Sequence, residues 1–130
     1  MVLFAVQGGV FSEGIDYAGD MLIGAFVVGP PLPNFDFERE KMKEYYQLKY
    51  QSGFDYAYTY PAMAKAVQSA GRVIRSDTDK GIIIMMDNRF LEGSFSKSLP
   101  LDWFTETPHE LVSNKILTDI ANFWNSTPSE

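Results

Sequence analysis

Three short apolar runs along the chain have the length and continuity of buried strands. They are Val2–Val6, Met21–Val28 and Gly81–Met86, and turn-forming or polar residues follow each of them. A strand that is covered on both faces reads as an unbroken apolar run, and such strands are typical of parallel sheets. The runs therefore predict three strands of a mostly parallel sheet.

Elsewhere the apolar positions follow a helical period. One helix is predicted from Phe35 to about Tyr50 and ends at Gly53, a second over Pro61–Ile74 with proline at its first position, and a third over Pro108–Trp124. Small residues line the second helix and allow a close approach to a sheet: Ala62, Ala66 and Ala70. Five apolar residues of the third are expected to face inward: Leu111, Ile116, Leu117, Ile120 and Phe123. This order of strands and helices predicts an α/β layered fold.

Composition is that of one globular domain. The chain has 130 residues, of which 45% are hydrophobic and 22% charged, and no apolar run reaches the ~20 residues of a membrane helix. There is no cysteine, which excludes disulfides and cysteine-ligated metals, and the single His109 argues against a zinc site. With no basic flank before Val2–Val6, no signal peptide is predicted. These features favour a cytoplasmic protein without membrane contact.

The charge is acidic overall but unevenly placed. Net charge is −6, which argues against a free-standing nucleic-acid binder, and the acidic excess lies in residues 13–44. Basic residues gather in the middle of the chain: Lys65, Arg72, Arg75, Lys80, Arg89 and Lys97. This local basicity suits a site for a few phosphates better than a broad DNA-binding face.

The most informative segment runs from Gln68 to Arg75 and fits the pattern Q-x-x-G-R-x-x-R. On a helix, Arg72 and Arg75 would project from one face, so both guanidiniums would reach the same triphosphate. Arginine presents a planar charged fork that stabilises charge on a transferring phosphoryl group. The alternative is that both arginines form ordinary surface salt bridges.

Three further motifs accompany this segment in a fixed order. Residues 8–16 read G-G-V-F-S-E-G-I-D, residues 29–33 read G-P-P-L-P, and residues 87–90 read D-N-R-F. Together with Q-x-x-G-R-x-x-R they resemble the C-terminal part of the second motor domain of XPD/DinG-type superfamily 2 DNA helicases. Weaker similarity continues through Leu99–Trp103. The resemblance implies a partial RecA-like three-layer domain over residues 1–130, with earlier strands and helices of that domain missing upstream.

The resemblance also implies roles for individual residues. Arg72 and Arg75 match the arginines that reach across the interdomain cleft to the γ-phosphate of ATP, and Gln68 matches the polar residue beside them. Asp16 takes the place of an aspartate that contacts the ATP ribose, with Gly14 in the same loop.

The nucleic-acid side of that loop is implied in the same way. Ser12, Glu13 and the backbone around Gly9 and Gly14 correspond to positions along the phosphate chain of single-stranded DNA. Helix N-capping is the alternative use of Glu13 and of the aspartate that follows it in this loop. Arg89 is expected to pair with its neighbour Asp87 rather than to touch DNA.

The chain lacks the other half of an ATP site. No G-x-x-x-x-G-K-[ST] loop and no D-E-x-H box occur in it, and the resemblance assigns both to a first motor domain that would hold most of the ATP and Mg²⁺. The family's iron–sulfur cysteines lie in that domain too, so the sequence leaves an iron–sulfur cluster open. We therefore expect a fragment of a nucleoid-associated helicase that moves 5′ to 3′ on single-stranded DNA, inactive alone.

Two other interpretations stay open at this point: a non-catalytic helicase-like module that binds nucleic acid or a protein, and an unrelated α/β domain. The helicase interpretation predicts that Ser12–Asp16 and Gln68–Arg75 lie side by side at the carboxyl edge of the sheet. Because three strands are few for this fold class, an uncovered apolar surface and self-association are also expected.

Overall fold

The structure is a computed structural model and describes residues 1–9, 17 and 21–126. Its strands and helices are, in chain order, β1 (Gly24–Val27), α2 (Phe37–Tyr50), α3 (Tyr60–Ala70), β2 (Ile82–Met85), α4 (Gly93–Lys97) and α5 (Ile116–Asn125). A π-helical segment, Asp55–Thr59, leads into α3, and three short 3-10 segments follow β2: Asn88–Leu91, Leu101–Trp103 and Pro108–Leu111. The predicted α/β class is therefore confirmed.

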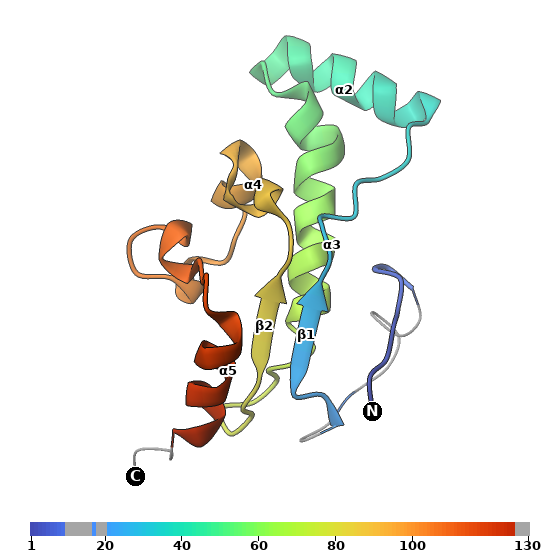
Figure 1. Cartoon of the computed structure of the whole chain (residues 1–130). Coiled ribbons are helices and arrows are strands. Elements are labelled where there is room, and N and C mark those ends of the chain that lie inside the picture. Colours follow the sequence, from blue (N-terminus) through green and yellow to red (C-terminus); the bar gives the residue numbers. More distant parts are fainter. Residues whose placement is uncertain (10–16, 18–20, 127–130) are drawn as a thin grey trace.

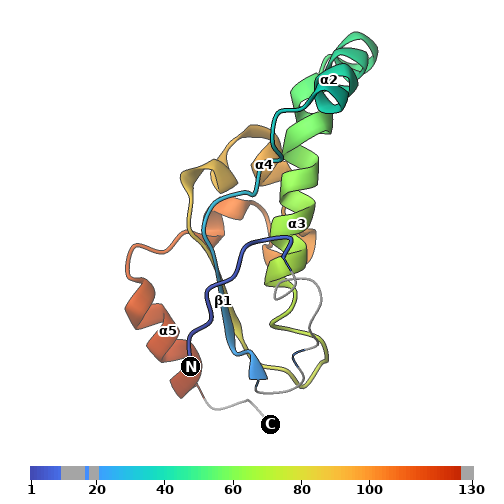
Figure 2. The same cartoon turned by 90° about the vertical axis from the view of Figure 1, so that its right-hand side faces the viewer.

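The two strands pair in parallel, with Gly24 opposite Ile82 and Val27 opposite Met85. Seen edge-on, α3 lies on one side of the sheet and α5 on the other, which gives a small three-layer arrangement (Figures 1 and 2). This agrees with the partial RecA-like domain that the sequence predicted.

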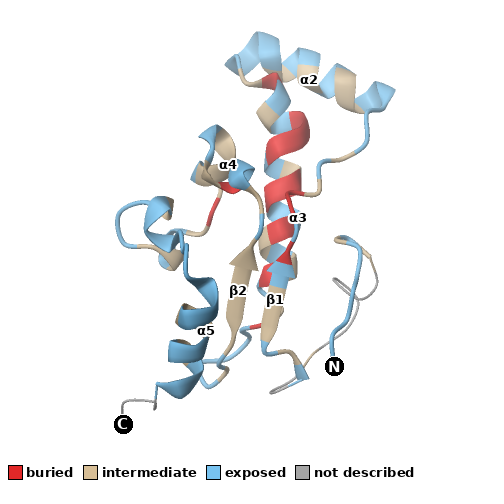
Figure 3. Cartoon of the chain, viewed as in Figure 1, coloured by how far each residue is buried: buried red, intermediate tan, exposed pale blue. Residues whose placement is uncertain are grey.

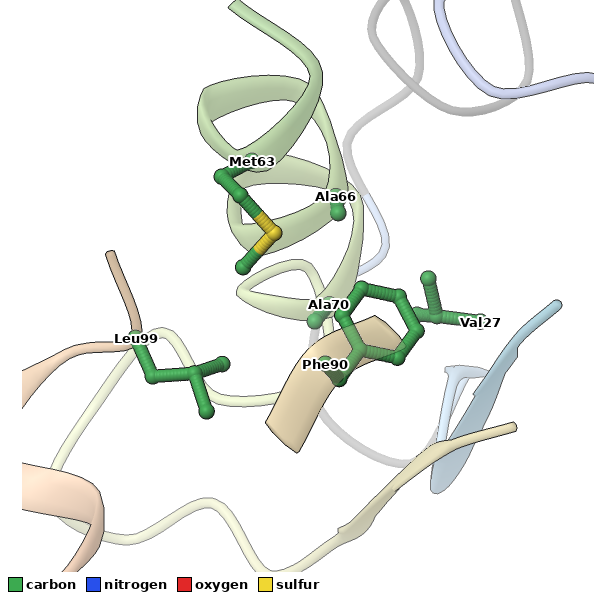
Figure 4. Close-up of a cluster of buried hydrophobic side chains, with 6 residues drawn as sticks. All are labelled: Val27, Met63, Ala66, Ala70, Phe90 and Leu99. Carbon is green, nitrogen blue, oxygen red and sulfur yellow. The ribbon is translucent and has the colours of Figure 1, made fainter. Parts of the chain in front are cut away.

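The core lies between α3 and the sheet. Its buried members come from the end of β1, from α3 and from the segments that follow β2: Val27, Met63, Ala66, Ala70, Phe90 and Leu99 (Figure 4). The predicted alanine stripe is fully buried, because side chains that end at Cβ let the helix backbone approach the strands. Burial is concentrated along α3, whereas α2 and α5 are largely exposed (Figure 3).

The prediction of a strand at Val2–Val6 is wrong in this structure. The segment runs past the edge of β1 that faces away from β2 (Figures 1 and 2), but its residues are exposed and form no ladder with it. Gln7, just after this segment, donates from Nε2 to the carbonyl of Gly29, two residues beyond β1, at 3.0 Å. Because Val2–Val6 makes no backbone ladder with β1, the described sheet has two strands rather than the predicted three.

Helix ends also differ from the predictions. Asp36 begins α2 by accepting the Arg39 backbone N–H at 2.8 Å, and Gln51, with φ +57°, ends it, so Gly53 is not the terminator. The helix predicted over Pro108–Trp124 is broken between Leu111 and Ile116. Of its five expected inward residues, three are exposed, Leu111, Ile116 and Leu117, and two are partly buried, Ile120 and Phe123.

Candidate functional site

The Q-x-x-G-R-x-x-R segment spans the end of α3 and the connection to β2. Gln68 lies exposed in the last turn of α3, and the helix ends at Ala70, where the Gly71 N–H donates to the Val67 carbonyl at 2.8 Å. Arg72 is half-buried and Arg75 exposed, both beyond the helix. We call residues 71–80 the arginine loop.

The prediction that both arginines project from one helix face is therefore wrong. A glycine lowers helix propensity at the point where the chain turns, and the turn places the Val73 side chain in the core with 2% of its surface exposed. Gly81 makes room for it, since a Cβ there would overlap the Val73 side chain. The free energy gained by burying Val73 thus outweighs that of extending α3. As a result, Arg72 and Arg75 lie on a loop.

The arginine loop lies at the amino end of the strands. It leads directly into β2, and β1 runs parallel to β2 (Figure 1). The predicted location of Gln68–Arg75 at the carboxyl edge is therefore wrong, because a helix that precedes a parallel strand must deliver the chain to its amino end. Its predicted neighbours Ser12, Glu13, Gly14 and Asp16 lie outside the described residues. Gly9 is described, and its N–H donates to the Val6 carbonyl at 2.9 Å in a tight turn.

A carboxylate organises the tip of the arginine loop. One oxygen of Asp79, Oδ2, accepts the backbone N–H groups of Arg75 at 2.9 Å and of Ser76 at 3.0 Å. The hydroxyls of Ser76 and Thr78 lie 3.0 Å apart beside it. These bonds, the one from Arg75 first, hold the pKa of Asp79 below its usual range.

A second anchor ties the arginine loop to α5. The Lys80 ammonium lies 4.9 Å from the centre of the Phe123 ring and 5.4 Å from that of Trp124, and it donates to the Ser126 carbonyl at 3.3 Å. The sequence placed Lys80 among the clustered basic residues but gave no sign of its contact with α5, and nothing in the pattern singled out Asp79.

The opposite, carboxyl edge of the sheet carries a structural ion pair. Arg89 donates from Nε to Asp87 Oδ1 at 3.0 Å and from Nη2 to Oδ2 at 2.8 Å, which confirms the expected pairing. Gly29, with φ +75°, lies against both side chains. The side-chain hydrogen bonds from Arg89 lower the pKa of Asp87 to about 2.

An open groove of about 1640 Å³ separates β2 from α5 and reaches the arginine loop at Gly71 and Ile74. Isoleucines of β2 line one side, and Ile116, Ile120 and Phe123 line the other.

Among the described residues, no three histidine or acidic side chains gather as a metal site, and no helix has the length and apolarity to cross a membrane. His109 is exposed in the short segment Pro108–Leu111, at a helix start as predicted. The arginine loop thus carries Arg72 and Arg75 together with Lys80, whose ammonium is held against α5.

Residues 1–107 match the family described as Helicase C-terminal domain. The ATP-dependent DNA helicase chl1 of Schizosaccharomyces pombe is 32% identical over 117 residues, which are 83% of this chain and 14% of that protein. The ATP-dependent DNA helicase DinG of Photobacterium profundum is 32% identical over 93 residues, 70% of this chain and 13% of its own length.

A third relative is the general transcription and DNA repair factor IIH helicase subunit XPD of Dictyostelium discoideum, 36% identical over 92 residues. These are 68% of this chain and 12% of that protein. The chain thus spans between 12% and 14% of the length of these three relatives. The family match covers all four sequence motifs, and the chain belongs to the helicase C-terminal domain family, in its XPD/DinG-type branch.

Proposed function

We propose that this chain supplies the second-domain wall of the ATP cleft in an ATP-dependent DNA helicase. The family match over residues 1–107, which contains the whole arginine loop, is the observation that carries the proposal. Each of the three relatives named above is called a helicase, and the first two are called ATP-dependent DNA helicases. The exposed Arg75 and half-buried Arg72 support it, because a γ-phosphate on a partner domain must be reached from the surface.

In this proposal the residues have distinct tasks. Arg72 and Arg75 stabilise negative charge on the γ-phosphate as it transfers, and Gln68 orients the phosphate beside them. Asp16 and Gly14 contact the ATP ribose side of the cleft.

The DNA side of the proposal concerns the preceding loop. Gly9, Ser12 and Glu13 lie along the backbone of single-stranded DNA, on which the motor moves 5′ to 3′. Such a protein works on chromosomal DNA, so nucleoid association follows from the proposal.

The proposed partner is a first motor domain, in the same polypeptide or in trans. It supplies the phosphate-cradling loop and the acidic residues that hold Mg²⁺, neither of which occurs in the 130 residues. ATP binding between the two domains then closes them, and hydrolysis and release reopen them.

The proposal is tested in the two-domain protein by Arg72→Ala and Arg75→Ala. Each is expected to lower kcat for ATP by about 10³-fold, the scale on which arginine fingers act. Affinity for single-stranded DNA, measured by fluorescence anisotropy, should change much less, because the guanidiniums face phosphate rather than DNA.

Lys97→Ala is the matched control, since it removes an exposed cation from α4 without altering the arginine loop. Near-normal ATP turnover in both arginine variants, with a loss of DNA binding, would move the arginines to the DNA track. Such a result would favour a non-catalytic nucleic-acid-binding module instead.

A further inference from the structure

The tip of the arginine loop is its least supported part. Residues 75–78 are all exposed, whereas Val73 on one side is buried in the core and Lys80 on the other is tied to α5. An exposed tip of this kind would sample many backbone conformations, and fixing them costs conformational entropy. A phosphate-stabilising arginine at such a tip needs something that defines its backbone.

We propose that Asp79 is a positioning residue that holds the backbone of Arg75 so that its guanidinium is aimed at the γ-phosphate. The inference rests on the proposed function of the arginine loop. Asp79 itself does not touch the nucleotide in this scheme and acts only through the peptide groups of Arg75 and Ser76.

The geometry supports this role in two ways. Both N–H groups converge on one oxygen of Asp79, so a single acceptor fixes two consecutive peptide planes. The loop is closed a second time within the same turn, because the Asp79 N–H donates to the Ser76 carbonyl at 3.2 Å. Arg75 directly precedes this turn, and its own N–H donates to Asp79 Oδ2, so the carboxylate fixes the peptide plane that leads into Arg75.

The neighbouring Asp77 provides an internal comparison. It lies in the same exposed tip and carries the same charge, and within the described part of the chain its side chain makes no hydrogen bond or ion pair. Removing Asp77 therefore changes the charge of the loop without changing its hydrogen bonds. Any difference between the two aspartates reports on the hydrogen bonds themselves.

The test compares Asp79→Ala, Asp79→Asn and Asp77→Ala in the two-domain protein, with Arg75→Ala alongside. Asp79→Ala is expected to lower kcat for ATP by about 10- to 100-fold, because small displacements of a catalytic group cost rate on this scale. The KM for ATP and the Kd for single-stranded DNA are expected to stay within about twofold, and the melting temperature within a few degrees, since residues 75–78 are exposed.

Asp79→Asn should recover most of that loss, because its amide oxygen can accept both N–H groups in place of Oδ2. Asp77→Ala should match the parent. If Asp79→Ala keeps the parental kcat, or if Asp79→Asn loses as much as Asp79→Ala, the positioning role is overturned. If Arg75→Ala itself leaves ATP turnover intact, the proposed function fails instead, so the two failures are told apart.

A second measurement needs only the chain described above and no activity. Amide hydrogen exchange by NMR should show protected N–H groups at Arg75 and Ser76 compared with Asp77 and Thr78, and Asp79→Ala should abolish that protection. Rapid exchange of the Arg75 and Ser76 amides in the unchanged chain would also overturn the proposal.

Discussion

At the scale of single residues, the Asp87–Arg89 pair shows how the carboxyl edge of the sheet is held. The pair packs on the backbone of Gly29, which follows β1, while its own residues follow β2. It therefore links the ends of both strands. The pair is partly exposed, so its contribution to stability is modest, but its dependence on pH is specific.

Arg89→Met should lower the melting temperature at neutral pH and leave it unchanged at very low pH. The pKa of Asp87 falls to about 2 in the folded protein and is near 3.9 in an unfolded chain, so the stabilisation is fully present above about pH 4. It is lost as the pH falls through about 2, because the protonated carboxyl no longer pairs with the guanidinium.

Circular dichroism melts of parent and variant between about pH 2 and 6 provide the check, with Lys97→Met as a control for loss of a cation. A difference in melting temperature that persists unchanged at the lowest pH would show that Arg89 acts through packing rather than through its charge.

At the scale of elements, the sequence predicted the strands and helices that are determined by the pattern of apolar and small residues within the segment itself. Runs such as Gly81–Met86 and the alanine stripe of α3 specify which residues face the core whatever the rest of the chain does. Helix ends depend on tertiary contacts that no local pattern contains. Val73 leaves the helical path because a pocket beside Gly81 exists only once β2 is in place.

The same distinction explains the outcome for the candidate site. The residue types and spacing of Q-x-x-G-R-x-x-R single out Arg72 and Arg75 as candidates, but they do not predict the loop that carries these residues or the sheet edge where they lie. Val2–Val6 shows that an apolar run alone does not predict a strand. A strand also needs a neighbouring strand to pair with, and Val2–Val6 does not pair with the free edge of β1.

At the scale of the whole molecule, two parallel strands leave much apolar surface uncovered. Exposed apolar residues occur on the outer face of β1, where Phe26 is 61% exposed, and along the groove beside α5. Surfaces of this kind favour association, and an acidic net charge only partly opposes it.

We expect the chain to self-associate in a concentration-dependent way through this face. Sedimentation velocity over a roughly hundredfold concentration range should show a rising average mass. Phe26→Lys should reduce the increase, because it places a charge on the apolar face. Leu48→Lys serves as the matched control, since Leu48 is 89% exposed on α2, away from the sheet. A mass that stays monomeric throughout, or equal effects of both variants, would contradict association through the sheet.

The chain by itself should not hydrolyse ATP. In the proposed function the arginine loop only adds charge to a phosphate held by another domain, and the phosphate-cradling loop and metal-binding box are absent from the sequence. Phosphate release measured with Mg²⁺ and single-stranded DNA should equal the buffer background. Turnover that rises in proportion to purified chain would refute the division of the ATP site between two domains.

The contact between Lys80 and α5 has a consequence for control of the motor. Residues 116–125 lie beyond the segment that matches the family, yet Phe123 and Trp124 hold the cation next to the loop that carries both arginines. Suppose that one molecule binds better when α5 is detached from Lys80 and that a nucleotide binds better when α5 is attached. Each then weakens the binding of the other, and linkage requires the two factors to be equal. Under the proposed function, a molecule that binds α5 is expected to change the affinity for ATP without entering the cleft.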